Sequence, residues 1–71
     1  MVKDIKLRNR VRQRRLFCEL TQSELGSIVN VTRQTIAFIE KGEFAPSIAL
    51  SLRLAAALKT PLNELFWLEE E

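Results

Sequence analysis

Two side chains that can read DNA bases, Arg33 and Gln34, are adjacent in the sequence. In the major groove an arginine can donate two hydrogen bonds to guanine, and a glutamine can pair with the edge of adenine. One helical turn further on, Ala37 and Phe38 carry apolar groups that could meet thymine methyl groups. These four positions are the candidate base-reading residues if one exposed helix face presents them all.

The helix that would carry these residues is predicted to run from Arg33 to Glu40. Thr32 can cap its start because a threonine hydroxyl accepts a hydrogen bond from an unpaired backbone amide in the first turn. Its end is marked by Lys41, a basic residue that is favourable near a helix C-terminus, and by Gly42, because glycine readily adopts the left-handed conformation that ends a helix.

A second short helix is predicted directly before it, over residues 22–29. Thr21, with Glu24 three residues later, forms a capping box, and Asn30 tolerates the left-handed conformation that closes a helix. Two short helices joined by a tight turn form the unit that places one helix in the major groove. The sequence therefore predicts a helix-turn-helix over about residues 21–40.

Three further helices are predicted around this pair. The first runs from Asp4, which can cap it, to Glu19, and the Leu-Phe pair at residues 16–17 is expected to be covered by other elements. Another follows Ser47 and carries too many apolar positions for one stripe, so it is expected to be the most buried helix. A short last helix begins with Pro61 in its first position.

The predicted fold is an all-α bundle of five helices that forms one domain over residues 1–71. Its extended ends, residues 1–3 and 66–69, could pair as a short two-stranded β-ribbon. Residues 69–71 form an acidic tail.

Composition excludes several classes of function. The chain has no histidine and a single cysteine, so it lacks ligands for a structural zinc and the usual general base, and we expect no enzymatic activity, metal or cofactor. No apolar run approaches the roughly 20 residues that cross a bilayer, so no membrane association is expected. A lone Cys18 fits a cytoplasmic protein.

Charge is distributed unevenly along the chain. Residues 1–41 hold nine Lys or Arg against four acidic residues, whereas residues 42–71 hold two against five. The basic half is the half expected to face a polyanion. Many of its arginines lie in the first predicted helix, where they could also form a solvated face or support non-specific binding of nucleic acid.

The run TQSELGSIVNVTRQTIAFIEKGEFAPS, followed by LRLAAALKTPLNELF, resembles the Cro and lambda-repressor type of helix-turn-helix domain, the XRE family, over about residues 9–66. The most specific pieces are Thr-Gln at 21–22, Val-Thr-Arg-Gln-Thr-Ile at 31–36, Ile-Glu-Lys-Gly at 39–42 and Pro-Ser at 46–47. With its short length and TPLNELFWL run, the chain is also similar to small stand-alone repressors such as the cytolysin repressor, a dimer with a terminal ribbon. The resemblance implies a lambda-repressor-like fold and a transcriptional regulator that binds double-stranded DNA.

The resemblance also assigns roles to residues outside the base-reading face. Gln22 matches a phosphate-contacting position, and Arg15 matches a residue that pairs with Glu40 and lies near phosphate. A purely structural role for this pair is the alternative. The predicted phosphate contacts are Arg14, Arg15, Gln22, Thr32, Thr35 and Lys41.

Three positions depart from the family pattern. Glu43 stands where many relatives carry a basic residue, and an acid in that loop would repel a nearby phosphate. Phe38 replaces a residue that is often small or polar, so it could read a thymine methyl or simply pack. Glu19 stands where glycine is common, which predicts a different geometry at the end of the first helix.

A specific regulator of this size needs a dimer, because one recognition helix reads too few base pairs. The expected form is a homodimeric repressor on a palindromic operator. The most apolar stretch available for an interface is C-terminal, and the predicted interface residues are Leu62, Phe66, Trp67 and Leu68. The alternative function is that of an antitoxin of the same fold, which would bind a protein partner as well as DNA.

Overall fold

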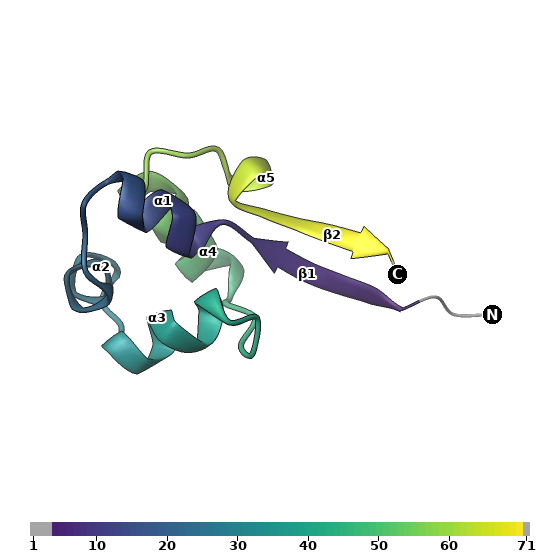
Figure 1. The fold of residues 1–71 in the computed structure, drawn as a ribbon, viewed down its shortest axis with the longest axis horizontal. Coiled ribbons are helices and arrows are strands. Elements are labelled where there is room, and N and C mark those ends of the chain that lie inside the picture. Colours follow the sequence, from purple (N-terminus) through teal and green to yellow (C-terminus); the bar gives the residue numbers. More distant parts are fainter. Residues whose placement is uncertain (1–3, 71) are drawn as a thin grey trace.

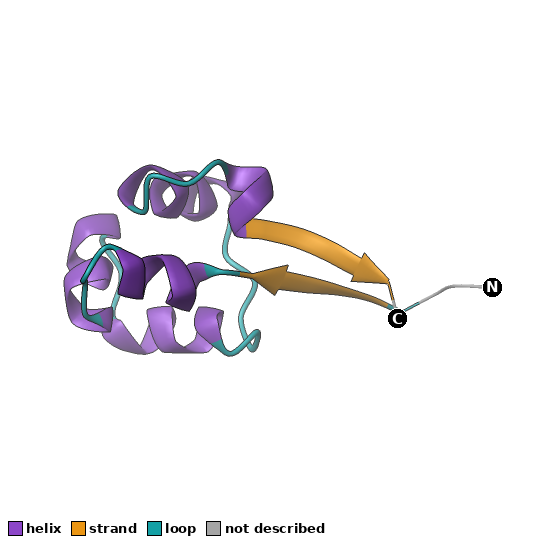
Figure 2. Ribbon diagram, turned by 45° about the horizontal axis from the view of Figure 1, so that its top comes forward, coloured by secondary structure: helices purple, strands orange, loops and turns teal. Residues whose placement is uncertain are grey.

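The computed structural model describes residues 4–70, which form five helices and a two-stranded sheet (Figure 1). The helices are α1 (Val11–Phe17), α2 (Gln22–Val29), α3 (Arg33–Glu40), α4 (Ile48–Ala57) and α5 (Leu62–Leu65), and the strands are β1 (Ile5–Asn9) and β2 (Phe66–Glu70). The helices pack into one body, from which the sheet projects (Figure 2). None of the helices found in residues 4–70 has the length and hydropathy needed to cross a membrane.

Every helix contributes to one hydrophobic core. The fully buried side chains include Val11 from α1, Leu25 from α2, Ile36 from α3, Leu54 from α4 and Leu65 from α5. Burying one such side chain stabilises a fold by roughly 1.5–3 kcal/mol relative to leaving it exposed. This shared core holds α3 against the rest of the bundle while its other face stays exposed.

The fold is not purely helical, because β1 and β2 form an antiparallel ribbon. The register runs from Ile5 opposite Glu70 to Asn9 opposite Phe66. Along β1 apolar residues alternate with basic ones, which is the period of a strand rather than of a helix. The C-terminal strand lies where the sequence predicts it, whereas the N-terminal strand is Ile5–Asn9 and was expected at residues 1–3, which lie outside the described residues.

The first helix is shorter at its start than the sequence predicts. Asp4 does not cap a helix, since α1 begins only at Val11 after the strand. Asn9 makes the junction between them: its Oδ1 accepts a hydrogen bond from the Val11 amide at 3.0 Å, and its Nδ2 donates to the Ile39 carbonyl at 3.0 Å. The ribbon is thereby attached to the end of α3.

The end of α1 also differs from expectation. The helix ends at Phe17, and Glu19 adopts φ +58°, the left-handed conformation that favours glycine. The chain therefore adopts at residue 19 the turn that a glycine would favour, although this residue carries a side chain. Leu16 and Phe17, expected to be covered, are 51% and 73% exposed because no other element of residues 4–70 packs over them.

Replacing Glu19 with glycine should raise the free energy of unfolding by about 0.5–1 kcal/mol. A left-handed non-glycine residue is disfavoured by roughly 1–2 kcal/mol, and the greater freedom of glycine in the unfolded chain offsets part of the gain. Urea denaturation followed by circular dichroism measures the change. Glu19→Ala is the matched control, because it keeps the Cβ; equal stability of the alanine and glycine variants would show that residue 19 is not strained.

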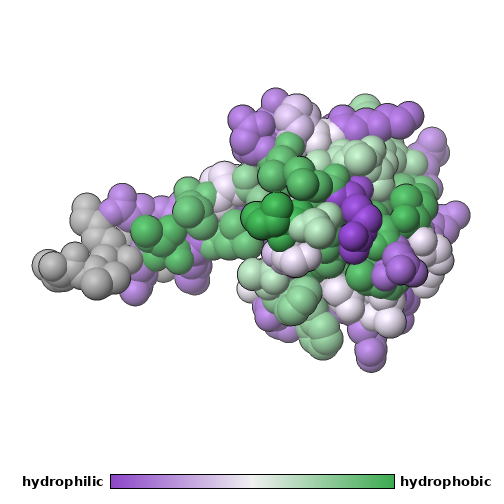
Figure 3. Space-filling model, turned by 180° about the vertical axis from the view of Figure 1, so that it is seen from behind, coloured by the Kyte–Doolittle hydropathy of each residue, from purple (hydrophilic) through white to green (hydrophobic). Residues whose placement is uncertain are grey.

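The fourth helix has one buried face rather than burial all round. Ser47 caps it as expected, with its Oγ accepting from the Leu50 amide at 3.1 Å. Ile48 and Leu52, however, are 73% and 52% exposed, and Pro61 precedes α5 as its N-cap instead of opening it. Figure 3 shows apolar side chains along the ribbon and on the adjoining part of the body.

Candidate nucleic-acid interface

The α2–turn–α3 unit has the bounds that its capping residues predict. The Thr21 Oγ1 accepts from the Glu24 amide at 3.0 Å, and the Glu24 carboxylate accepts from the Thr21 amide at 2.8 Å. Asn30 closes α2 at φ +64°. The Thr32 Oγ1 accepts from the Thr35 amide at 3.2 Å and begins α3. Both helix starts are therefore fixed by local hydrogen bonds.

Gly26 holds the turn close to α2 and was missed by the sequence reasoning. A Cβ at this position would lie 2.7 Å from the Val31 carbonyl oxygen, closer than such atoms approach in folded proteins. The Gly26 carbonyl itself accepts from the Val31 amide at 2.8 Å. The available signal was a glycine inside an amphipathic helix, where alanine would otherwise be favoured by about 1 kcal/mol.

The outward face of α3 presents the candidate base-reading residues together. Arg33 and Gln34 are exposed in the first turn, Ala37 is half-buried, and Phe38 is 46% exposed one turn later. The opposite face of α3 is buried and consists of Ile36 and Ile39. Phe38 therefore does not pack into the core and is available to a ligand of this face.

A buried ion pair joins α1 to the end of α3. The Arg15 Nε donates to the Glu40 Oε2 at 2.7 Å and its Nη2 to the Oε1 at 3.3 Å, and the two side chains are 9% and 4% exposed. The Arg15 Nη1 donates to the Leu20 carbonyl at 2.8 Å. Gln22 adds a hydrogen bond from its Nε2 to the Glu40 Oε1 at 3.1 Å, which brings α2 into the network. This geometry orients α3 relative to the other two helices.

The six candidate phosphate-contacting residues do not all lie together. Thr32 and Thr35 flank the start of α3, Lys41 is exposed at its end, and Gln22 opens α2 beside Arg15. A surface depression lined in part by Gln22, Ser23 and Arg33 connects the first turns of α2 and α3.

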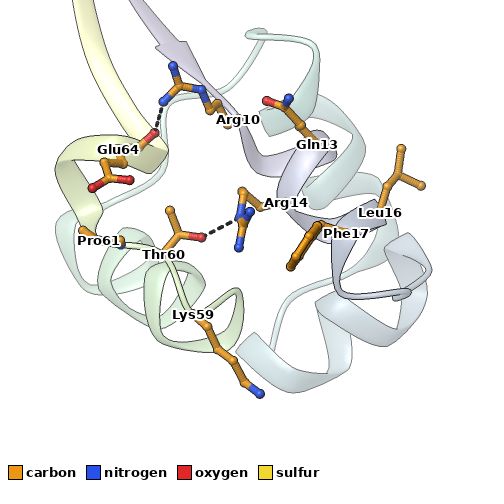
Figure 4. A pocket seen from close by; sticks show the side chains of 9 residues that line it. All are labelled: Arg10, Gln13, Arg14, Leu16, Phe17, Lys59, Thr60, Pro61 and Glu64. Atoms are coloured by element: carbon orange, nitrogen blue, oxygen red, sulfur yellow. Dashed lines mark hydrogen bonds between the residues drawn. The ribbon is translucent and has the colours of Figure 1, made fainter.

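Arg14 faces a different side of the molecule and does not join this group. Its Nε donates to the Thr60 Oγ1 at 2.8 Å, and its guanidinium lies 4.4 Å from the centre of the Phe17 ring (Figure 4). Successive residues point about 100° apart around a helix, so Arg14 and Arg15 cannot both face α3. The structure thus does not bring Arg14 together with the other predicted phosphate contacts.

The loop after α3 carries the acidic residue that departs from the family pattern. Gly42 adopts φ +76°, and the Glu43 amide bonds to the Phe38 carbonyl at 2.9 Å. The Glu43 side chain is exposed two residues after Lys41. An acid at this place reduces the attraction of the loop for phosphate.

The residues predicted to form a dimer interface line one apolar groove of about 490 Å³. Leu62, Phe66 and Trp67 are half-buried there, and Leu68 is 68% exposed. The groove also includes Leu7 from β1 and Ile48 from α4, which the sequence reasoning did not assign to it. The signal for Leu7 was the alternation of apolar and basic residues in β1.

Comparisons with known proteins agree with this geometry. The helix-turn-helix family model matches residues 11–65. The chain is 43% identical to YgzD of Bacillus subtilis, an uncharacterized HTH-type transcriptional regulator, over 92% of this chain and 98% of that protein. An uncharacterized HTH-type transcriptional regulator of Methanothermobacter thermautotrophicus is 42% identical over 92% of this chain and 96% of that protein. The crystal structure of the restriction-modification controller protein C.AhdI from Aeromonas hydrophila gives a TM-score of 0.74 at 32% identity, covering 80% of this chain and 86% of that chain.

Proposed function

The chain belongs to the helix-turn-helix family of DNA-binding transcriptional regulators, and we propose that it is a homodimeric repressor of a palindromic operator. The observation that carries the proposal is the exposed polar face of α3: Arg33 and Gln34 stand in its first turn, and the opposite face is buried through Ile36 and Ile39. Such a helix can enter the major groove without unfolding any part of the bundle.

In the proposed complex, side chains of α3 read bases while the surrounding groups fix the register. Arg33 donates to guanine and Gln34 pairs with adenine, and the apolar groups of Ala37 and Phe38 meet thymine methyls. Contacts to phosphate come from the first turns of α2 and α3 and from Lys41. They set the position of the helix but carry no sequence information.

Dimerisation follows from the geometry of a palindromic site. A two-fold axis places two recognition helices about 34 Å apart, one turn of DNA. We assign the two-fold contact to the apolar groove that contains Phe66, Trp67 and Leu68, because it is a contiguous apolar surface of a small domain. An operator that overlaps a promoter would then exclude polymerase when the dimer binds.

The test compares how Arg33→Ala changes the affinity of the protein for selected and for unselected DNA. Duplexes are first selected from a random pool with the wild-type protein, and Kd values are then measured by fluorescence anisotropy. We expect Arg33→Ala to weaken binding to the selected duplex by about 1–3 kcal/mol and to relax the preference at one base pair, because a bidentate contact is lost. Binding to a random duplex should change little.

Arg12→Ala is the matched control, since Arg12 is an exposed arginine of α1. It should affect both duplexes equally and weakly. A wild-type protein that binds selected and random duplexes alike would rule out a specific repressor. An equal loss on both duplexes for Arg33→Ala would show that Arg33 contacts only the backbone.

A further inference from the structure

A pocket that the DNA-binding face does not use lies between α1 and the connection from α4 to α5 (Figure 4). It has a volume of about 680 Å³. Three of the described residues that line it are cationic, Arg10, Arg14 and Lys59, against the single acid Glu64. The pocket therefore favours a negatively charged occupant.

The cations of this pocket retain hydrogen-bonding capacity. Arg14 uses one of its five N–H donors for the bond to Thr60, and within residues 4–70 no other hydrogen bond engages its terminal amino groups. The bond to Thr60 and the stacking on Phe17 hold the guanidinium in a fixed direction. Lys59 is exposed at the opposite wall and has no side-chain partner among the described residues.

Arg10 closes the end of the pocket nearest the ribbon. Its guanidinium lies 4.4 Å from the centre of the Trp67 ring, and its Nη1 donates to the Glu64 carbonyl at 2.8 Å. Trp67 is the only tryptophan of the chain, so its fluorescence responds to changes at this wall of the pocket.

The rim of the pocket is apolar and uncovered. Leu16 and Phe17 stand beside Arg14 at the end of α1 with 51% and 73% of their surface exposed. Arginine and aromatic residues are both enriched at the centres of protein–protein interfaces. A small organic anion would fill the hollow but would leave this rim in water, whereas a peptide could cover both.

We propose that this pocket binds an acidic peptide segment of another protein that carries an apolar anchor residue. Carboxylates of the segment pair with Arg14 and Lys59, and the anchor packs on Leu16 and Phe17. Because Arg14 and Arg15 point in different directions from α1, a partner held here leaves α3 free for DNA. This binding does not depend on the proposed repressor function and can be measured without DNA.

The test uses four defined probes against the isotopically labelled full chain. They are an acetylated peptide of sequence Glu-Asp-Glu-Leu-Phe-Glu-Asp, its neutral Gln/Asn counterpart, the acidic peptide with Ser-Ser in place of Leu-Phe, and sodium benzoate. Amide chemical shifts map the site, and Trp67 fluorescence gives the Kd. We expect the first peptide to bind at least about tenfold more tightly than the other three, with shifts on α1 and residues 59–61.

Three variants decide whether the mapped pocket is the site that binds the acidic peptide. Lys59→Gln and Arg14→Gln should each weaken binding of the acidic peptide by about tenfold. Arg12→Gln, which lies on α1 with Arg14 but outside the pocket, should leave the Kd unchanged. Lys59 is exposed, so its variant remains informative even if Arg14→Gln loses stability with the bond to Thr60. Equal binding of benzoate, shifts centred on α3, or an unchanged Kd for Lys59→Gln would each overturn the proposal.

Discussion

Replacing Glu40 with alanine should lower the free energy of unfolding by about 3–5 kcal/mol, enough to unfold much of a domain whose total stability is of that order. The substitution leaves the Arg15 guanidinium as an uncompensated charge at a position where the residue is only 7% exposed. It also removes the carboxylate that accepts from Gln22. Urea denaturation followed by circular dichroism measures the loss.

Two controls separate the charge from the packing. Gln22→Ala removes one hydrogen bond and should be destabilising by only about 1 kcal/mol. The double variant Arg15→Met with Glu40→Leu buries no charge and should recover most of the lost stability, because apolar pairs of similar volume can replace buried ion pairs. If Glu40→Ala unfolds at the same urea concentration as the wild type, the ion pair does not hold α3 in place.

The same double variant distinguishes the two roles considered for Arg15. If the pair is structural, the refolded double variant should bind a selected duplex with nearly wild-type affinity. A phosphate contact from Arg15 would instead weaken binding to every duplex and lower the salt dependence by about one unit of slope. The bonds from Arg15 to Glu40 and to the Leu20 carbonyl favour the first result.

The helix-turn-helix was predictable from sequence because its boundaries are set locally. The capping box of Thr21 and Glu24, the left-handed Asn30 and the cap at Thr32 each involve residues no more than four positions apart. Such hydrogen bonds form wherever the helix does, whatever packs around it. The outward face of α3 then follows from its period and its two buried isoleucines.

The N-terminal strand was not predictable in the same way, since its partner is about as far away in sequence as the chain allows. Leu7 and Val11, four residues apart, fit a helical stripe as well as they fit a strand followed by a helix. Pairing with β2 decides in favour of the strand, and Arg8 adds an ion pair to Glu69 at 2.6 Å across the ribbon. The alternation of apolar and basic residues in β1 is too short to outweigh this helical spacing by itself.

The arginine cluster shows a second limit of sequence reasoning. Arg14 and Arg15 are neighbours of the same type, yet one stacks on Phe17 and the other is buried against Glu40. Which side each faces depends on where α3 and the α4–α5 connection lie, and that is a property of the packed bundle. The pocket beside Arg14 became visible only with that packing.

Replacing Leu68 with aspartate should convert the proposed dimer into a monomer and weaken its binding to a selected operator by about 2–5 kcal/mol. This loss is about half of the 4–10 kcal/mol that separates specific from non-specific binding, since one of two half-sites is no longer held by the same molecule. Leu68 is 68% exposed in one chain, so the substitution leaves the fold intact while placing a charge in the proposed apolar contact. Light scattering after gel filtration and anisotropy titration measure the two effects.

The matched control for the dimer is Ile28→Asp, which charges an exposed apolar side chain of α2 that is outside the groove and 56% exposed. The oligomeric state should not change for this variant, because Ile28 lies on α2, whereas the groove is formed by the ribbon, α4 and α5. A Leu68→Asp protein that remains dimeric would move the two-fold contact away from the ribbon. One that becomes monomeric yet binds the operator as tightly as the wild type would show that a single α3 supplies the specificity, which is more than one recognition helix of this length is expected to provide.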